Sequence, residues 1–188
     1  MRTIKIDNHL IGFGQPVYVI AEAGVNHEES IETAEKMIVD AARVGAQCIK
    51  FQTYQAGKLV VRDAPKYWDD PENLVANQYE MFDGRNTFSE SDWRRLIVKC
   101  EEEGITFMSS AWDEENVDML DTLGMPAFKI GSADITSLPL ISYTARKGKP
   151  IILSTGASTM GEIEAALEVI RAEGNEDIIL LHCILSYP

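Results

Sequence analysis

Short apolar runs alternate with polar, helix-forming stretches along the whole chain. Six of these runs begin near residues 19, 48, 106, 127, 151 and 178. Apolar runs of this length between helical stretches are typical of buried parallel strands. The stretches between them place apolar residues at three- and four-residue steps, as amphipathic helices do. The pattern therefore predicts a strand–helix unit that repeats along the chain.

Start and stop signals bound the predicted helices. Polar residues able to accept a hydrogen bond from the first helical turn precede each apolar stretch. The expected caps are Ser30, Asp113 and Ser137, with the capping-box pairs Ser89–Asp92 and Thr159–Glu162. Glycines end the same helices at Gly45, Gly104, Gly124, Gly148 and Gly174.

Two segments stand outside the repeat. Residues 3–20 alternate apolar and polar positions and predict a short hairpin that caps one end of the fold. Residues 55–87 are polar, contain two prolines and show no steady periodicity. We expect a long loop there, with one helical turn near 72–82, and long loops of this kind are often functional lids.

Strict strand–helix repetition leaves two architectures, an open doubly wound sheet and a closed (β/α)8 TIM barrel. Polar residues follow nearly every predicted strand, which favours the barrel, because an open sheet concentrates its site at one switch point. A full barrel takes about 250 residues, whereas only six strands precede Pro188. We therefore expect residues 1–188 to form an α/β barrel truncated after the sixth strand, with the hairpin as an N-terminal cap.

Composition narrows the choice of partners. A formal net charge of −13 disfavours nucleic acid and anionic membrane surfaces, which bind clustered Lys and Arg. The sequence shows no apolar stretch of membrane-spanning length and no signal-peptide h-region, so we expect a cytoplasmic protein. The three cysteines are widely spaced in apolar surroundings and predict buried, reduced thiols.

Two lysines lie at strand ends, Lys50 and Lys129. A buried ammonium without a partner is costly, so each lysine must either form a strand-end salt bridge or face an anionic ligand. Hydroxyl groups at matching strand ends favour the ligand. Together with backbone amides they predict a carboxylate or phosphate site built from Lys50, Lys129, Ser110, Ser132, Ser154 and Thr155.

Two carboxylates are candidates for proton transfer. Glu22 lies in an apolar strand, where it would be desolvated unless it met a lysine or a substrate hydroxyl. Asp134 follows Ser132 and serves either in proton transfer or in capping the local turn. For His182 a hydrogen-bonded core position is favoured over a ligand role, and His27 is interpreted as a residue at the start of the first helix.

Several motifs occur in a fixed order from about residue 17 to Pro188. They read IAEAGVNHEES, IKFQTY, FKIGSAD, ILSTGAS and LHCILSYP. In these motifs the chain resembles the sialic acid (N-acetylneuraminate) synthase family, the NeuB-type phosphoenolpyruvate-condensing nonulosonic acid synthases. The resemblance implies a (β/α)8 barrel followed by a small antifreeze-like (SAF) domain, which we expect this chain to lack, and a homodimer for the full-length protein.

The resemblance also implies a reaction. The family condenses phosphoenolpyruvate (PEP) with an N-acetylated sugar aldehyde, such as N-acetylmannosamine, and releases phosphate and a nine-carbon 2-keto sugar acid. Carried over to this sequence, Glu22 and Asp134 are the acid/base pair. The PEP-binding residues are Lys50, Ser110, Lys129, Ser132 and Ser154, and the sugar-binding residues are Gln52 and Tyr187.

A divalent metal, Mn²⁺ or Mg²⁺, is implied by the resemblance as a Lewis acid on the aldehyde. Its two histidine ligands are expected on strands beyond Pro188, so we expect no metal ligand within this chain and little or no activity from it alone. Asp134 stands where some members carry glutamate, and Leu185 where several carry a polar residue. The acceptor thus stays open among the sialic, legionaminic and pseudaminic acid pathways.

Two other functions are compatible with the same residues. A Schiff-base aldolase on the same fold would use Lys129 as a nucleophile with a lowered pKa. A non-catalytic alternative is a truncated barrel that acts as an assembly partner and completes itself with another chain.

Overall fold

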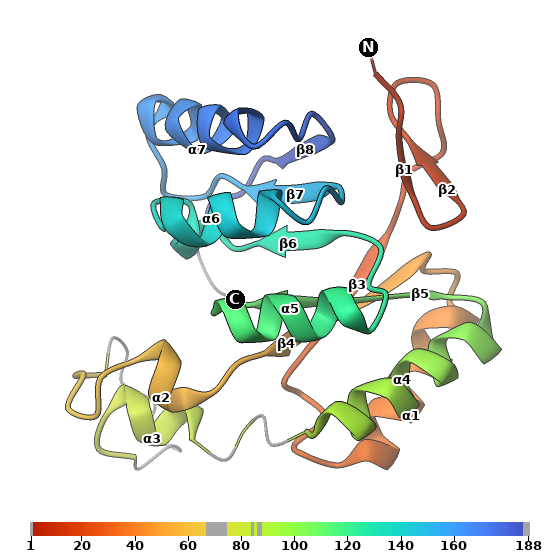
Figure 1. The fold of residues 1–188 in the computed structure, drawn as a ribbon. Coiled ribbons are helices and arrows are strands. Elements are labelled where there is room, and N and C mark those ends of the chain that lie inside the picture. The colour runs from red at the N-terminus through yellow and green to blue at the C-terminus, as the bar shows by residue number, and fades with distance from the viewer. Residues whose placement is uncertain (1, 67–74, 84, 86–87, 186–188) are drawn as a thin grey trace.

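A six-stranded parallel sheet lies at the centre of the computed structural model, which describes residues 2–66, 75–83, 85 and 88–185. The strands lie side by side in chain order (Figure 1). They are β3 (Ile20–Gly24), β4 (Cys48–Thr53), β5 (Thr106–Ala111), β6 (Phe128–Ile130), β7 (Ile151–Ser154) and β8 (Ile178–Leu181). Each strand pairs in parallel with the next, so all of the strands end at one edge of the sheet.

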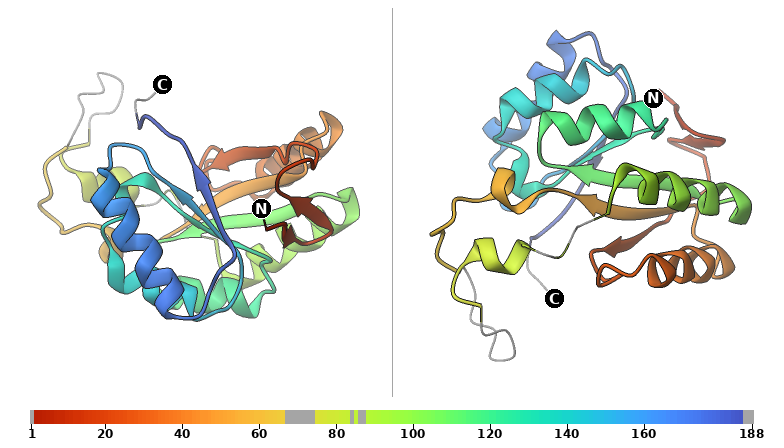
Figure 2. Two further views of the ribbon diagram at one scale, coloured as in Figure 1. Left: turned by 90° about the horizontal axis from the view of Figure 1, so that it is seen from above. Right: turned by 60° about the horizontal axis from the view of Figure 1, so that its bottom comes forward.

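Five longer helices connect these strands and lie along the outer face of the curved sheet (Figure 2). They are α1 (Ile31–Arg43), α4 (Glu90–Glu103), α5 (Glu114–Thr122), α6 (Leu138–Ala145) and α7 (Met160–Ala172). A parallel sheet with strands in sequential order and helices on one face curls as a barrel does. The expected strand–helix repeat and the barrel class are confirmed, as a curled half-barrel of six strands.

The helix caps follow the sequence signals with one exception. Ser30 and Asp113 accept backbone N–H groups of their helices, and Ser89 and Thr159 form capping boxes with Asp92 and Glu162. The prediction for Ser137 is wrong in its detail: it occupies the N-cap position of α6, but its side chain makes no capping hydrogen bond. Pro139 lies in the first turn of α6 and has no backbone N–H. One of the donors from which the Ser137 side chain could accept a hydrogen bond is therefore missing.

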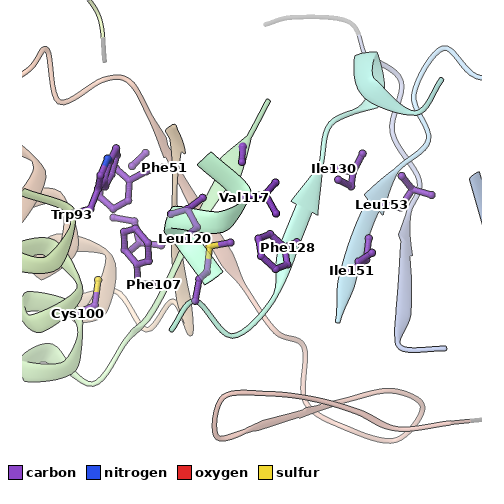
Figure 3. Packing of buried hydrophobic residues seen from close by; sticks show 14 of the residues in the cluster. Phe51, Trp93, Cys100, Phe107, Val117, Leu120, Phe128, Ile130, Ile151 and Leu153 are labelled. Atoms are coloured by element: carbon purple, nitrogen blue, oxygen red, sulfur yellow. The ribbon is translucent and has the colours of Figure 1, made fainter. Parts of the chain in front are cut away.

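The main core fills the space between the sheet and its helices. Figure 3 shows Trp93 and Cys100 of α4 turned toward Phe51 and Phe107 of the sheet. The Phe51 and Phe107 rings stack at 5.8 Å, and Trp93 packs edge-on to Phe51 at 6.0 Å. Large side chains of this kind lose most of their contact with water here, which is the main stabilising contribution to the fold.

A second core lies on the inner face of the sheet. Strands β1 (Ile4–Ile6) and β2 (His9–Ile11) form an antiparallel hairpin beside the ends where the parallel strands begin (Figure 1). Its buried side chains join those of the parallel strands in one cluster: Ile4, Ile6, Cys48, Met108, Ala127 and Ile152. The predicted hairpin is confirmed, and it closes the amino end of the sheet interior.

The long segment after β4 contains two short helices, α2 (Ala56–Leu59) and α3 (Gln78–Phe82). The helical turn predicted near 72–82 matches α3 in part, and its first residues lie outside the described ranges. Helix α2 was not predicted, because four residues are too few to show a period. Within the described ranges, no helix is both long and apolar enough to cross a bilayer.

Candidate active site

Lys50 and Glu22 meet on the inner face of the sheet. They are register partners on β4 and β3, and their side chains form an ion pair. The Lys50 side chain is 9% exposed, whereas that of Glu22 is 52% exposed. The expected contact between Glu22 and a lysine is therefore present, and the Glu22 carboxylate remains partly open to solvent.

Lys129 reaches the same region from β6. Burial and the positive charge of Lys50 together lower the pKa of its ammonium to about 8, against the opposing effects of Cys183, Glu22 and Asp134. Its Nζ donates a hydrogen bond to the backbone carbonyl of Ile130 at 2.7 Å. Two ammonium groups thus lie close enough to repel each other, an arrangement that an anionic ligand would relieve.

Ser110 and Gln52 lie beside the lysines. Ser110 is buried, and it is the register partner of both Gln52 on β4 and Lys129 on β6. Gln52 follows Lys50 by two residues, so both side chains lie on the inner face. A Cβ added at Gly24 would lie 3.5 Å from Glu22 Oε1 and 3.7 Å from Gln52 Nε2, so both polar groups lie beside this glycine, where a side chain would crowd them.

Ser132 and Ser154 come from the next strand ends. The backbone N–H of Gly156 donates to the hydroxyl of Ser132 at 3.0 Å, which joins the loops after β6 and β7. Ser154 is buried at the end of β7. Thr155, in contrast, donates its hydroxyl hydrogen to the Leu181 carbonyl at 2.9 Å and so ties β7 to β8.

Asp134 closes a short 3-10 turn, Ser132–Asp134, directly after β6. Burial raises the pKa of its carboxyl group, while hydrogen bonds from Trp112 and the Gly131 backbone and the charge of Lys129 oppose that rise. A carboxylate with a raised pKa near a lysine suits proton transfer. Sequence reasoning missed Trp112, although it follows a predicted strand directly in the motif TFMSSAWD.

Three further residues from the sequence analysis have different outcomes. His182 is exposed, so its interpretation as a core histidine is wrong. Cys183 is half-buried, unlike Cys48 and Cys100, so only two of the three thiols are buried as predicted. Tyr187 lies outside the described residues.

His27 is fully buried between the start of α1 and Phe88, with its ring stacked on that phenyl ring at 4.4 Å. Burial lowers its pKa, and its Nδ1 accepts the Glu29 backbone N–H at 3.1 Å. A neutral ring that accepts at Nδ1 carries its proton on Nε2. His27 therefore shapes the loop after β3, as its predicted position at the start of the first helix implied.

Candidate metal ligands do not cluster in the described part of the chain. In the ranges that the structure describes, no three His, Cys, Asp or Glu side chains gather closely enough to hold a metal ion. The Glu22 carboxylate is paired with Lys50 and so is not arranged as a metal ligand. The described residues thus fit an anion better than a divalent cation.

Comparison with known proteins gives consistent matches. The sequence model of the NeuB family matches residues 37–188. A protein of Methanocaldococcus jannaschii is 39% identical over 188 residues, which are 100% of this chain and 52% of that protein. The N,N'-diacetyllegionaminic acid synthase of Campylobacter jejuni is 38% identical over 174 residues, 90% of this chain and 52% of the enzyme. The chain thus spans about half the length of these relatives.

A solved structure matches as well. The N-acetylneuraminic acid (sialic acid) synthetase of Leptospira borgpetersenii, in complex with citrate, superposes with a TM-score of 0.85 at 31% identity. The match covers 100% of this chain and 61% of the synthetase. The curled sheet and its helices therefore have the same arrangement as the corresponding part of that enzyme.

Proposed function

Because the chain belongs to the NeuB family, we propose that it binds PEP and takes part in the condensation of PEP with an N-acetylated sugar aldehyde. The observation that carries the proposal is the pair of ammonium groups on the inner face of the sheet. Burial and the neighbouring Lys50 lower the pKa of Lys129 to about 8, so an anion with two charged groups would stabilise both lysines in their protonated form.

The donor is proposed to lie across the strand ends of β4 to β7. Its phosphate and carboxylate would be bound by two ammonium groups and by hydroxyls from three neighbouring strand ends, which supply charge-assisted hydrogen bonds. The donor-binding residues are Lys50, Ser110, Lys129, Ser132 and Ser154. Gln52 is proposed to contact the acceptor, since it is only half-buried at the outer end of β4, and Tyr187 is proposed for the same role from its sequence position.

The chemistry needs proton transfer at two places. A new bond joins C3 of PEP to the aldehyde carbon, whose oxygen takes a proton, and water adds to C2 as the C2–O bond to phosphate breaks. Glu22 and Asp134 both lie close enough to Lys129 to raise its pKa. We assign them the two proton transfers, one to the aldehyde oxygen and one from the attacking water.

Mn²⁺ or Mg²⁺, when bound, would polarise the aldehyde as a Lewis acid. Since the described residues offer no group of three suitable ligands, no step is assigned to the metal here. The acceptor is proposed to be N-acetylmannosamine or a relative, as the matched sialic and legionaminic acid synthases differ in the product that each is named for. We also propose that the full-length protein is cytoplasmic and forms a homodimer.

Calorimetric titration of PEP into the purified protein tests the donor site directly. Saturable binding with a Kd of about 1 µM to 1 mM is expected, in the usual range of enzyme substrates. Because residues 1–188 alone are expected to show little or no activity, turnover is followed by NMR in the full-length protein with PEP, N-acetylmannosamine and Mn²⁺. Phosphate release that depends on the sugar is expected there. Phosphate release without any new nine-carbon keto acid, or no binding of PEP at all, would refute the proposal.

A Schiff-base aldolase is a second candidate, and one observation favours it. With a pKa of about 8, Lys129 is neutral in a far larger fraction of molecules at neutral pH than an ordinary lysine, as a carbonyl-attacking amine must be. Borohydride reduction in the presence of pyruvate distinguishes the two reactions. A reduced pyruvate adduct on Lys129 would identify the aldolase, and an unmodified lysine with PEP bound would identify the synthase.

A further inference from the structure

Two glycines just after β6 and β7 leave space that neighbouring side chains occupy. A Cβ added at Gly131 would lie 2.6 Å from Asp134 Oδ2, and a Cβ added at Gly156 would lie 2.9 Å from Ser132 Oγ. Among the described glycines, no other would bring a Cβ closer than 3.0 Å to another residue. Neither glycine has a positive φ, so the backbone conformation does not require either of them. Both positions therefore depend on contacts with residues of the candidate active site.

The backbone of Gly156 holds the hydroxyl group of Ser132. Gly156 is buried, and its N–H donates to Ser132 Oγ at 3.0 Å. A hydroxyl group has one hydrogen to donate and two lone pairs that accept. Because the N–H occupies one lone pair, the hydroxyl hydrogen is directed elsewhere, and within the described residues it has no acceptor. Ser132 is only half-buried, so an anion can reach this hydrogen.

The loop after β8 packs against the same glycine. The Cβ added at Gly156 would also lie 3.0 Å from both the backbone N and the Cβ of Leu185. Leu185 has a φ of 62°, a left-handed conformation that such a residue keeps only where its surroundings hold it. Carbon and oxygen atoms in contact are ordinarily about 3.3 Å or more apart. A side chain at position 156 would therefore have to displace the Ser132 hydroxyl, Leu185 or both.

We propose that Gly156 is the positioning residue of Ser132. Its N–H orients the hydroxyl so that the hydroxyl hydrogen is donated to bound PEP, and its lack of a side chain leaves room for the hydroxyl in that place. The inference rests on the proposed function, in which Ser132 binds the donor. Because its N–H is bonded to Ser132, Gly156 acts on the donor through that hydroxyl and not directly.

Gly156→Ala adds the Cβ and keeps the N–H. Calorimetric titration should give a Kd for PEP about tenfold above that of the wild type, the effect of one lost hydrogen bond to a charged group. In a Ser132→Ala background the same substitution should raise the Kd by less than about twofold, because the hydroxyl that it displaces is already absent. Gly161→Ala in α7 is the matched control. A Cβ at Gly161 has no neighbour within 4 Å beyond its own helix, so the Kd should stay the same.

Two calorimetric results would overturn the proposal. One is an unchanged Kd in a folded Gly156→Ala protein. The other is an equal rise of the Kd with and without the Ser132 hydroxyl, which would mean that the added Cβ acts through Leu185 alone.

The amide signal of Gly156 in ¹H–¹⁵N NMR provides a readout that needs no variant of this glycine. The signal should shift when PEP saturates the wild type, and it should move upfield in Ser132→Ala without PEP, because the N–H loses its acceptor. A signal that neither change affects would overturn the proposal. A wild type that binds no PEP would refute the proposed function instead, and the signal in Ser132→Ala would still decide whether Gly156 holds the hydroxyl.

Discussion

The carboxylate of Glu22 forms an ion pair with the ammonium group of Lys50, its register partner on the neighbouring strand. Lys50 is buried and Glu22 is half-exposed, so the glutamate compensates a charge that would otherwise be costly. An anionic donor that binds Lys50 would take over this compensation. Glu22 would then be available for proton transfer only once the donor is bound.

Glu22→Gln should therefore affect turnover more than donor binding. Loss of the carboxylate removes a competitor for Lys50, so the Kd of PEP should stay the same or fall, while kcat should drop by about 10²- to 10⁴-fold, as for loss of a general acid or base. Calorimetry and steady-state kinetics of the full-length protein measure the two effects. Glu115→Gln, whose carboxylate pairs with Lys58 outside the site, is the control. Weaker PEP binding in Glu22→Gln would assign this residue a structural role.

Lys129→Ala should weaken PEP binding. The variant lacks one of two ammonium groups, so a multiply charged anion is under-neutralised, and the Kd should rise by about 10- to 100-fold for one charge-assisted contact. Lys147→Ala is the matched control, because Lys147 pairs with Asp118 on the helical outer layer. Calorimetric titration compares both variants with the wild type. Equal Kd values for Lys129→Ala and wild type would remove Lys129 from the donor site.

PEP binding should also depend on pH through Lys129. Its pKa of about 8 in the free protein means that the ammonium is mostly neutral above that pH, whereas the bound anion holds it protonated. Affinity should therefore be full below pH 8 and fall by up to about tenfold per unit above it, with a proton taken up on binding. The phosphate is already doubly ionised in this range.

Proton uptake is measured by titration near pH 8 in two buffers with different ionisation enthalpies. The uptake should vanish in Lys129→Met, which keeps the length of the side chain. Proton release, or uptake that persists in Lys129→Met, would show that another group titrates.

The hairpin should contribute measurably to stability. Ile6 is 0% exposed in the inner core, so Ile6→Ala should lower the free energy of unfolding by about 2–4 kcal/mol through the lost apolar contacts and the cavity. Leu10→Ala, at a position that is 51% exposed in the same hairpin, should change it by less than about 0.5 kcal/mol. Urea denaturation measures both, and equal effects would mean that the hairpin does not pack as described.

Much of the fold could be predicted because its signals are local. The caps at Ser30, Asp113 and Thr159 depend on residues three positions apart, and the alternation of strands and helices needs only the period of the apolar residues. The proximity of Lys50 and Lys129 could also be predicted from the sequence, because the ends of parallel strands meet at one edge of the sheet.

Other features depend on contacts that one sequence does not show. The exposure of Glu22 depends on how far the sheet curls, and the orientation of the Trp112 ring depends on its edge-on contact with Tyr54, which follows a different strand. Helix α2 is too short for a periodic signal, and the missing cap at Ser137 reflects a proline in the following turn. These are long-range or single-residue effects with no repeating pattern.

The N-terminal hairpin helps to exclude water from the surroundings of the two lysines. Met108 and Ile152 are the register partners of Lys50 and Lys129, and both pack in the cluster that holds Ile4 and Ile6. Water is thereby kept from one side of the ammonium groups, and the low dielectric there is what makes their mutual repulsion large. The apolar side chains of the hairpin thus help to determine how much of Lys129 is charged at neutral pH.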